Sequence, residues 1–540
     1  MPSIKRWVIH PFLLSVYPIL MLVAYNIQTV TAWMVFRPIV VAILVAGLLF
    51  GMFSLILKNA RKAGLIVTLL MLLFLSYGHG YGILKENPIF GVTLGRHSIM
   101  ISLWLVIFAV GAVLILRTKR DLLKLSEALN VVAVIAVLFP LVQIAGYGFQ
   151  SSRALPESPG AQNNNELPLP AELTNLKPPG ENAPDIYFII LDGYGRDDTL
   201  KQYFNYDNSA FLHSLEGLHF YVARCSQSNY SATQLSLASS LNMNYLPALG
   251  VDEKQGDDQT PLNHLIDTNF TRRVLTNLGY KTVSVESGFS PTEWVNADYY
   301  LSARSNPGKA NYFGGINSFE SLVMRTSGGL ILYSITNRLP DTMKSFLDAA
   351  YNEHRDTILY ALDALEKIPS LPGHKFIFVH ILAPHEPFVF GPDGGYVGRK
   401  IPFTLNHDLE TQDPKVYVEG YRGQVIYLNT RVIPILQKVI ASSRVPPVII
   451  IEGDHGPLSR ISSENARLTN LIAFYMPEGG DKNLYPTITS VNTFRLIFNT
   501  YFGAKLRLLD NASYFYDKAH NVFRPTINIR PDCQSSGAGN

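Results

Sequence analysis

The sequence predicts an N-terminal region of five transmembrane helices followed by an α/β domain with a mostly parallel central sheet. Three observations support this fold class. Five apolar stretches lie in the first 150 residues, short apolar runs alternate with helix-length segments after residue 184, and a polar, proline-rich segment separates the two regions. Only 16% of the 540 residues are charged, compared with about 25% in an ordinary soluble domain. The 45 basic and 42 acidic residues nearly balance, so the composition does not indicate a nucleic-acid partner.

The five apolar stretches have the length that a bilayer requires of a helix, which is about 20 residues for a core of about 30 Å. They are Trp7–Asn26, Pro38–Leu57, Ala63–Leu84, Ser98–Leu116 and Ala128–Phe149. The first stretch follows Lys5 and Arg6, as a signal peptide would, but it lacks a small-residue cleavage site. Because four more stretches follow it, we expect it to be retained as the first span.

Basic residues in the loops predict the orientation, because Lys and Arg accumulate on the cytoplasmic side of a membrane. The N-terminus and the second and fourth loops together hold nine of them. The first and third loops hold three: Arg37, Lys85 and Arg96. We therefore expect a multi-pass protein of the cytoplasmic membrane whose N-terminus is inside and whose residues after 150 are extracytoplasmic.

Composition divides the chain into four regions. The transmembrane region covers 1–150, a flexible Pro/Asn-rich linker 151–183, an extracytoplasmic domain 184–505 and a C-terminal extension 506–540. Five apolar runs in the third region are predicted strands: Ile186–Leu191, Thr282–Val285, Phe376–Leu382, Val448–Ile451 and Leu471–Tyr475. Helices are expected near 262–278, 350–367, 415–442 and 490–503. Buried strands interleaved with helices are typical of a mostly parallel sheet.

Polar side chains follow three of these predicted strands, at the sheet edge where α/β proteins bind their ligands. Asp192 follows the first strand in an Asp-Gly turn, and Asp454 and His455 follow the fourth between two glycines. His380 and His385 lie at and after the end of the third. An Asp-Gly pair alone is commonly just a turn, but the Asp-His pair favours a functional site. Carboxylate and imidazole together suit Zn or Mn, with Mg and Ca as alternatives.

A hydroxyl-rich segment, Ser228–Leu241, becomes helical in its second half and contains Ser231 and Thr233. A hydroxyl at a helix N-terminus meets free N–H groups and the positive end of the helix dipole, which suit a phosphate or sulfate. A metal ion on the same oxygen would make it a nucleophile. Simple N-capping also explains such residues, and taken alone it is the better explanation.

Four features then occur in order along the chain. They are an acidic residue after the first strand, a Thr ahead of a Ser-Leu-Ala-Ser helix start, a His in a Pro-His-Glu-Pro turn and an Asp-His pair between glycines. The pattern resembles the alkaline phosphatase superfamily and, more narrowly, its sulfatase-like membrane branch. Lipoteichoic acid synthases and lipid A phosphoethanolamine transferases of that branch also place five spans before an outward-facing domain.

The resemblance implies a sulfatase-like catalytic domain with one divalent metal ion, Mn or Zn in the first place. Its implied ligands are Asp192, Thr233, Asp454 and His455. It also implies that Thr233 is the nucleophile and that His385 contacts the substrate, with His380 as a weaker candidate for the same role.

The chain departs from its relatives in ways that narrow this expectation. A sulfatase needs a Cys or Ser in a Cys-x-Pro-Ser-Arg setting, whereas residues 232–236 contain neither Pro nor Arg, so sulfate hydrolysis by that route is not expected. We find no Asp-x-x-x-His pair for a second ion between residues 184 and 540. Lipoteichoic acid synthases usually have Glu where this chain has Asp192, which leaves the transferred group open.

The two cysteines, Cys225 and Cys533, exclude a disulfide-rich scaffold and a multi-cysteine metal site. A disulfide between them and two separate reduced thiols both stay open at this point.

The hypothesis is thus a membrane-bound transferase or hydrolase in which Thr233 attacks the phosphodiester of a lipid and forms a phosphothreonine. An acceptor hydroxyl or water then releases the group. A membrane lipid is the expected partner, and no protein partner is indicated. Two alternatives stay open: a sulfuric or phosphoric ester hydrolase with a soluble substrate, and a non-catalytic lipid-binding regulator with the same fold. The retention of all four implied ligands argues against the regulator.

Overall fold

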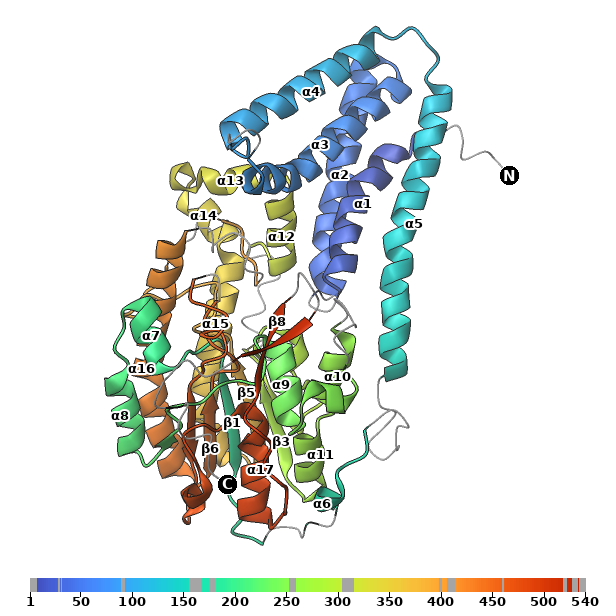
Figure 1. Ribbon diagram of the computed structural model, residues 1–540. Coiled ribbons are helices and arrows are strands. Elements are labelled where there is room, and N and C mark those ends of the chain that lie inside the picture. The colour runs from blue at the N-terminus through green and yellow to red at the C-terminus, as the bar shows by residue number, and fades with distance from the viewer. Residues whose placement is uncertain are drawn as a thin grey trace. The chain divides into compact units, whose positions relative to one another are not determined.

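The computed structural model describes residues 7–27, 30, 32–88, 93–154, 167–174, 176, 180–251, 259–303, 315–397, 401–405, 413–458, 461–517, 522–526 and 533. Parts of the predicted linker 151–183 and of the C-terminal extension 506–540 therefore lie outside the described residues. The chain forms two compact units (Figure 1). The first, the membrane unit, comprises 1–163, 312–350 and 398–404. The second, the sheet unit, comprises 164–311, 351–397 and 405–540.

The membrane unit contains five N-terminal helices. They are α1 (His10–Tyr25), α2 (Ala32–Leu57), α3 (Ala60–Glu86), α4 (His97–Arg117) and α5 (Leu123–Ala154). Among the described residues, four helices, α2 to α5, are long and apolar enough to cross a membrane. The helix α1 has 16 residues, or about 24 Å at 1.5 Å per residue, which is shorter than a bilayer core. The five apolar stretches are thus helical, and a fifth crossing stays a prediction.

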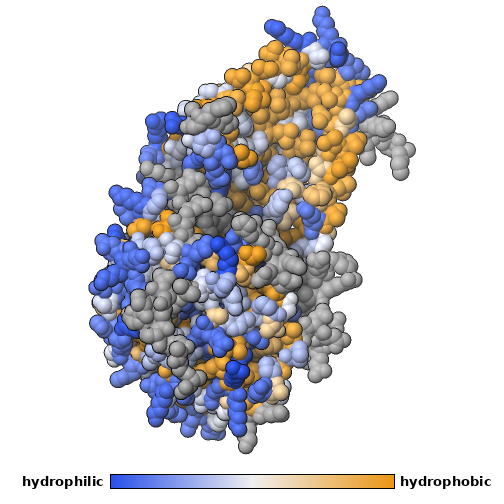
Figure 2. Space-filling model, viewed as in Figure 1, coloured by the Kyte–Doolittle hydropathy of each residue, from blue (hydrophilic) through white to orange (hydrophobic). Residues whose placement is uncertain are grey.

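Large apolar side chains cover the outside of these helices. Leu44 of α2 is 65% exposed and Leu105 of α4 is 61% exposed, and apolar residues dominate this part of the surface (Figure 2). Soluble proteins rarely expose a continuous apolar surface of this kind, so the exposed faces of these helices are suited to lipid.

Three further helices belong to the membrane unit although they come much later in the chain. They are α12 (Ser318–Thr326), α13 (Leu330–Ser334) and α14 (Asp341–Leu347). In the sequence they fall inside the region 184–505, where composition does not set them apart.

The sheet unit is built on a mixed sheet that has seven strands within the described residues, in the order β2-β7-β6-β1-β5-β3-β4. The strands are β1 (Ile186–Leu191), β2 (Tyr221–Val222), β3 (Lys281–Val285), β4 (Tyr299–Leu301), β5 (Lys375–Ile381), β6 (Val448–Glu452) and β7 (Ile472–Tyr475). The strand β1 is parallel to β5 and β6, and β3 is parallel to β4 and β5. The strand β7 is antiparallel to β6 and β2. All five apolar runs predicted as strands are therefore strands of this sheet.

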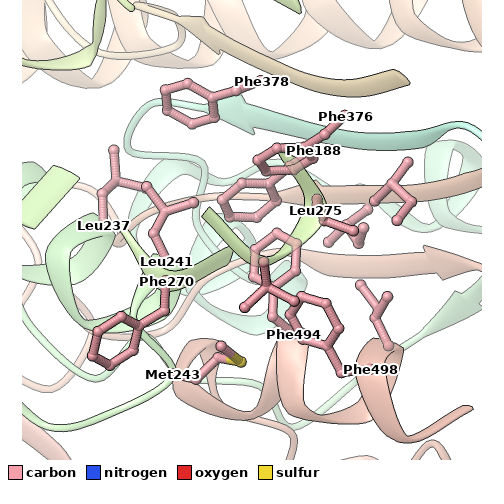
Figure 3. Close-up of a cluster of buried hydrophobic side chains, with 14 of the residues drawn as sticks. Phe188, Leu237, Leu241, Met243, Phe270, Leu275, Phe376, Phe378, Phe494 and Phe498 are labelled. Carbon is pink, nitrogen blue, oxygen red and sulfur yellow. The ribbon is translucent and has the colours of Figure 1, made fainter. Parts of the chain in front are cut away.

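Helices cover the sheet and supply its core. They are α6 (Ala171–Thr174), α7 (Asp197–Phe204), α8 (Ser209–Gly217), α9 (Thr233–Leu241), α10 (Thr260–Asp267), α11 (Phe270–Asn277), α15 (Ala349–Leu365), α16 (Pro414–Ser442) and α17 (Ser490–Phe502). Figure 3 shows Phe188 and Phe376 of the sheet packed against Phe494 of α17, with ring centroids 5.0 and 5.8 Å away. Leu237 and Leu241 of α9 belong to the same cluster, so the core holds α9 against the sheet.

The structure differs from the sequence expectation at residues 262–278, where two helices, α10 and α11, replace one. The break falls at Asn269, whose side chain accepts the Arg272 N–H and so caps α11. Asn favours such caps over a helix interior because its side chain competes for backbone groups.

The C-terminal extension contributes an antiparallel hairpin, β8 (Ser513–Asp517) and β9 (Val522–Thr526). Beyond it, Cys533 forms a disulfide with Cys225, with the Cα atoms 5.5 Å apart. Of the two alternatives for the cysteines, the structure shows the disulfide.

Candidate metal centre

The three best-placed candidate ligands meet at one edge of the sheet. Because β1 and β6 are parallel neighbours, their carboxyl ends open on the same side. Asp192 follows β1 directly, and Asp454 and His455 follow β6. One oxygen of each carboxylate and one ring nitrogen of His455 all lie within 4.8 Å of one another. All three side chains are buried, at 3, 0 and 1% exposure.

Glycines allow the two turns to approach each other. Gly193 has a φ of +72°, a conformation that other residues rarely adopt, and its N–H donates to Asp454 Oδ1 at 2.9 Å. A Cβ on Gly453 would lie 2.3 Å from the carbonyl oxygen of Tyr194. The glycines around the Asp-His pair are therefore required by close backbone contact as well as by the turn.

The residues present fit a divalent cation. Asp192 Oδ1 and Asp454 Oδ2 are buried, and no described group donates a hydrogen bond to either. Buried carboxylate oxygens without a partner are costly. His455 Nε2 lies 3.7 and 3.4 Å from these two oxygens without bonding to them. Ligands held at 2.0–2.1 Å from one tetrahedral ion are separated by about 3.3 Å, so the three atoms suit a shared ion.

Thr233 and Arg467 converge on the same imidazole nitrogen. The Nδ1–H of His455 donates to the carbonyl oxygen of Gly456 at 3.0 Å, which leaves Nε2 as an acceptor. Thr233 Oγ1 lies 3.3 Å from this Nε2 and Arg467 Nη2 lies 3.2 Å from it. Thr233 is also the first residue of α9, so its hydroxyl lies at the positive end of a helix dipole. The hydroxyl and the guanidinium therefore border the candidate metal centre.

The charges in the cluster oppose one another. Burial by itself would raise the pKa of Asp192, but His385, His380 and His455 together hold it below its usual value. Burial, followed by repulsion from Asp192, raises the pKa of Asp454. Burial and then Arg467 lower the pKa of His455, so this imidazole is neutral. The site thus disfavours a second negative charge, a cost that a bound cation removes.

The two remaining histidines have different surroundings. His380 lies on β5, is 1% exposed and places its Nε2 3.3 Å from Asp192 Oδ2. Its Nδ1 is 2.9 Å from the hydroxyl of Thr292. His385 is only half-buried, and its ring centroid is 6.3 Å from that of His455. His380 therefore supports Asp192 from inside the sheet, whereas His385 lies at the rim of the centre.

Ser231 and Thr233 are two residues apart but have separate partners. Ser231 Oγ accepts the N–H of Tyr516 at 3.0 Å, and the N–H of Tyr514 donates to the carbonyl oxygen of Asn229 at 2.9 Å. Both Tyr residues belong to β8. The C-terminal hairpin is thus bonded to the segment that leads into Thr233.

Two residues of the site were not found from the sequence. Arg467 donates through Nε to the Ser231 carbonyl at 2.9 Å and through Nη1 to the Gly456 carbonyl at 3.1 Å. The hydroxyl of Tyr421 donates to the Gly193 carbonyl at 2.8 Å. Arg467 lies in an irregular segment without a motif, and Tyr421 is one of many aromatic residues in α16, so neither carries a local signal.

Comparison with known proteins adds a set of distant structural likenesses. No family model matches the chain, and no curated protein does. The chain is similar to lipooligosaccharide phosphoethanolamine transferase A, an integral membrane protein of Neisseria meningitidis, with a TM-score of 0.38 and 11% identity over 91% of this chain and 95% of that chain. It is similar to the C-terminal periplasmic domain of EcEptC from Escherichia coli in complex with Zn, with a TM-score of 0.40 and 12% identity over 64% of this chain and 93% of that chain. It is also similar to the lipoteichoic acid synthase LtaP of Listeria monocytogenes, with a TM-score of 0.33 and 13% identity over 64% of this chain and 81% of that chain.

These neighbours are of the kinds that the sequence motifs resemble. Their identities and TM-scores are low, so none of them transfers a fold or an activity to this chain. The chemistry of the site has to follow from its own contacts.

Proposed function

We propose that this protein is a membrane-bound, metal-dependent enzyme that transfers or hydrolyses a phosphoryl-linked group of a lipid. One observation carries the proposal. The hydroxyl of Thr233 lies 3.3 Å from His455 Nε2, at the border of a buried cluster in which one oxygen of each carboxylate, Asp192 Oδ1 and Asp454 Oδ2, has no described donor. A nucleophile beside an acidic, imidazole-containing metal centre is suited to phosphoryl transfer.

Asp192, Asp454 and His455 would hold the cation, with Thr233 as the fourth ligand. A divalent cation bound there supplies positive charge that lowers the pKa of an adjacent hydroxyl and polarises a phosphoryl oxygen. The Thr233 hydroxyl would lose its proton to water, and its Oγ would form a bond to phosphorus while the bond from phosphorus to the leaving oxygen breaks. A protonated His385 would give the leaving oxygen its proton. Attack by an acceptor hydroxyl or by water on the phosphothreonine restores Thr233.

Arg467 is assigned to the anionic group of the substrate. Its side chain is held by two backbone carbonyl groups, and its Nη2 points at the same nitrogen as Thr233. A guanidinium presents several donors in one plane and matches two oxygens of a phosphoryl group. Arg467 would therefore orient the phosphoryl group toward the hydroxyl of Thr233.

The apolar helices support a lipid as the substrate, because they keep the enzyme in the membrane that contains it. The Cys225–Cys533 disulfide supports an extracytoplasmic sheet unit, since disulfides persist in oxidising compartments and are rare in the cytosol. The disulfide agrees with the orientation that the basic loops predict.

The proposal is tested with the full-length protein in lipid nanodiscs that contain head-group-labelled phospholipids. We expect about one Zn or Mn per chain by elemental analysis and a labelled product that requires the metal. Asp192→Asn should lower both metal content and turnover. Turnover of soluble aryl phosphates or sulfates without any lipid product would support the soluble-ester hydrolase instead. A stoichiometric metal without turnover of any ester would support the regulator.

A further inference from the structure

The helix α12 packs among the N-terminal helices of the membrane unit. Phe319 is 2% exposed and belongs to a cluster with Ile19 and Val23 of α1 and Met34 and Ala42 of α2. The neighbouring side chains of α12 that pack against this cluster are Leu322 and Val323. One face of α12 is therefore buried between helices that are themselves apolar enough for a bilayer.

An ion pair sets the depth of α12 along α2. Arg37 lies in the second turn of α2, inside a segment that is long and apolar enough to cross a membrane. Its guanidinium bonds both carboxylate oxygens of Glu320 and also the carbonyl oxygen of Gly315. A charge within a span is tolerated when it has such a partner. The partner of Arg37 comes from α12, which places Glu320 at the level of the first turns of α2.

The loop after α12 fits closely onto α3. The N–H of Gly328 donates to the carbonyl oxygen of Phe74 at 2.7 Å. A Cβ on Gly78 would lie 2.1 Å from the carbonyl oxygen of Arg325, so only glycine permits this approach. The contact involves the backbone of both segments, which makes it a built feature of the unit.

The helices α13 and α14 have an apolar surface on their outside as well as a core. Tyr333 and Leu347 are buried against Ile316. Four large apolar side chains on the same segment are exposed, by 36 to 45%: Leu332, Ile335, Met343 and Phe346. The start of this segment lies against α3 at Phe74, which is itself 48% exposed, because a Cβ on Gly328 would lie 2.6 Å from the Phe74 ring.

We propose that residues 315–348 form a second membrane anchor, in which α12 inserts beside the spans and α13–α14 lie in the adjoining leaflet. The occupant of the exposed apolar surface is the interfacial acyl-chain region of the lipid leaflet. The attachment of this segment to α3, which is long and apolar enough to cross a membrane, at the exposed Phe74 favours lipid over a protein partner. The segment also carries two basic residues, Arg338 and Lys344, the second of which pairs with Asp341 at 2.9 Å, and basic side chains beside apolar ones are typical of interfacial helices. The proposal concerns the membrane unit alone and does not depend on the activity of the metal centre.

The test uses cysteine labelling of the full-length protein in lipid vesicles. Both native cysteines are in the disulfide, so a single introduced cysteine accepts a maleimide carrying an environment-sensitive fluorophore. Leu332→Cys and Phe346→Cys report on the anchor. Leu105→Cys on the exposed face of α4 is the control for lipid contact, and Ser214→Cys, exposed on α8 of the sheet unit, is the control for water.

We expect blue-shifted emission at positions 332 and 346, together with a loss of fluorescence when nitroxide-labelled lipids replace ordinary lipids, as at position 105. Emission like that at position 214, with no quenching, would overturn the proposal. Blue-shifted emission without quenching would also overturn it, since it would mean that a second copy or another protein covers the surface. Because the substituted side chains are exposed, folding of each variant should be preserved, and circular dichroism checks this.

Discussion

Thr233 and Ser231 show how two similar residues differ through their contacts. The Thr233 hydroxyl borders the candidate metal centre, whereas the Ser231 hydroxyl accepts a backbone N–H from the C-terminal hairpin. From the sequence, Thr233 is selected as the nucleophile because it stands three residues before Ser236, at the start of the Ser-Leu-Ala-Ser run. Ser231 of the same hydroxyl-rich segment is the alternative. Because the two hydroxyls have different partners, substituting each residue in turn should affect different properties of the protein.

We expect Thr233→Ala to abolish turnover and to leave the melting temperature nearly unchanged, because the hydroxyl is lost from the site and not from the core. Ser231→Ala should keep most activity but lower the stability by about 1 kcal/mol, because the Tyr516 N–H loses its acceptor. Product assays and thermal unfolding measure the two effects. Mass spectrometry of the wild type with its donor should show a phosphoryl adduct on the peptide that contains Thr233. An active Thr233→Ala variant would show that Thr233 is not the nucleophile.

Arg467 should act on the substrate and not on the metal. We expect Arg467→Ala to lower kcat by about 10²-fold or more, the usual effect of removing one donor to a charged transition state, with unchanged metal content. Arg467→Lys keeps the charge but not the planar donor group, so it should restore only part of kcat. Steady-state kinetics and elemental analysis of the same samples check this. Loss of metal in Arg467→Ala would show that Arg467 only supports His455.

Glu452 gives stability a pH dependence. Burial, with a smaller contribution from Asp454, raises the pKa of Glu452 to about 8, while the unfolded chain ionises this residue near 4.5. Between these values the folded state holds one more proton than the unfolded state, so the free energy of unfolding falls as pH rises, by at most about 1.4 kcal/mol per pH unit. Denaturant titrations of the metal-free protein at pH 5 to 8 should show this fall, and Glu452→Gln should reduce it. An equal pH dependence in both proteins would contradict the assignment.

Sequence patterns located the residues of the site that follow strands, and they missed those that arrive from elsewhere. Asp192, Asp454 and His455 come directly after apolar runs, so their placement depends on local order and on the pairing of β1 with β6. Arg467 and Tyr421 reach the same turns through contacts between distant segments. No periodicity or motif marks such contacts, because they depend on the path of the chain after the sheet has formed.

At the scale of elements, the apolar runs predicted five strands of the sheet and the long helices. The prediction failed at residues 262–278, where a helix cap divides one expected helix into two. The helix expected at 262–278 breaks because Asn269 caps α11, a local preference that hydrophobic periodicity does not detect. The hairpin β8–β9 was not predicted at all. Its Tyr514 ring stacks on Tyr230 with centroids 5.8 Å apart, so it is stable as part of the sheet unit and not through its own short sequence.

The disulfide ties this C-terminal element to the segment before Thr233. It joins residues that are 308 positions apart in the sequence. Removing a native disulfide commonly lowers the free energy of unfolding by about 2–5 kcal/mol, which is also the size that loop-closure entropy gives for a long loop. The variant with Cys225→Ser and Cys533→Ser should therefore unfold at a lower temperature than the wild type. Dithiothreitol should lower the melting temperature of the wild type by a similar amount. The double variant should not respond to dithiothreitol. An unchanged melting temperature in the variant would show that the hairpin holds without the bond.

At the scale of the whole molecule, composition separated a membrane region from an α/β domain but placed α12 to α14 with the latter. Residues that fasten α12 to the bundle, such as Phe319 and Glu320, look in sequence like those of any amphipathic helix. The chain leaves the sheet unit after residue 311 and returns to it at 351, and only contacts with α1, α2 and α3 reveal this.

A chain that starts at Gly180 should therefore not be freely soluble. It would keep α12 but lose the partners of Phe319, Leu322 and Val323. Full burial of a side chain such as Phe319 contributes roughly 1.5–3 kcal/mol, and the partly buried Leu322 and Val323 contribute less. We expect it to require detergent or to bind liposomes. Replacing 315–348 by a glycine-serine linker should give a monodisperse protein with an unchanged metal content, as size-exclusion chromatography and elemental analysis would show. A soluble chain without that replacement would contradict the packing of α12.

The pairing of Arg37 with Glu320 also imposes an order on biosynthesis. The two residues are separated by 283 positions, which a ribosome adds in roughly 15 to 60 s at about 5–20 residues per second. For that interval, the newly inserted α2 carries a cation whose partner has not been translated. Headgroups and water have to solvate it, by snorkelling toward the nearby end of the helix. A ribosome that stops before residue 320 leaves this cation without the carboxylate of Glu320, so the chain up to that point cannot form the ion pair that fastens α12 to α2.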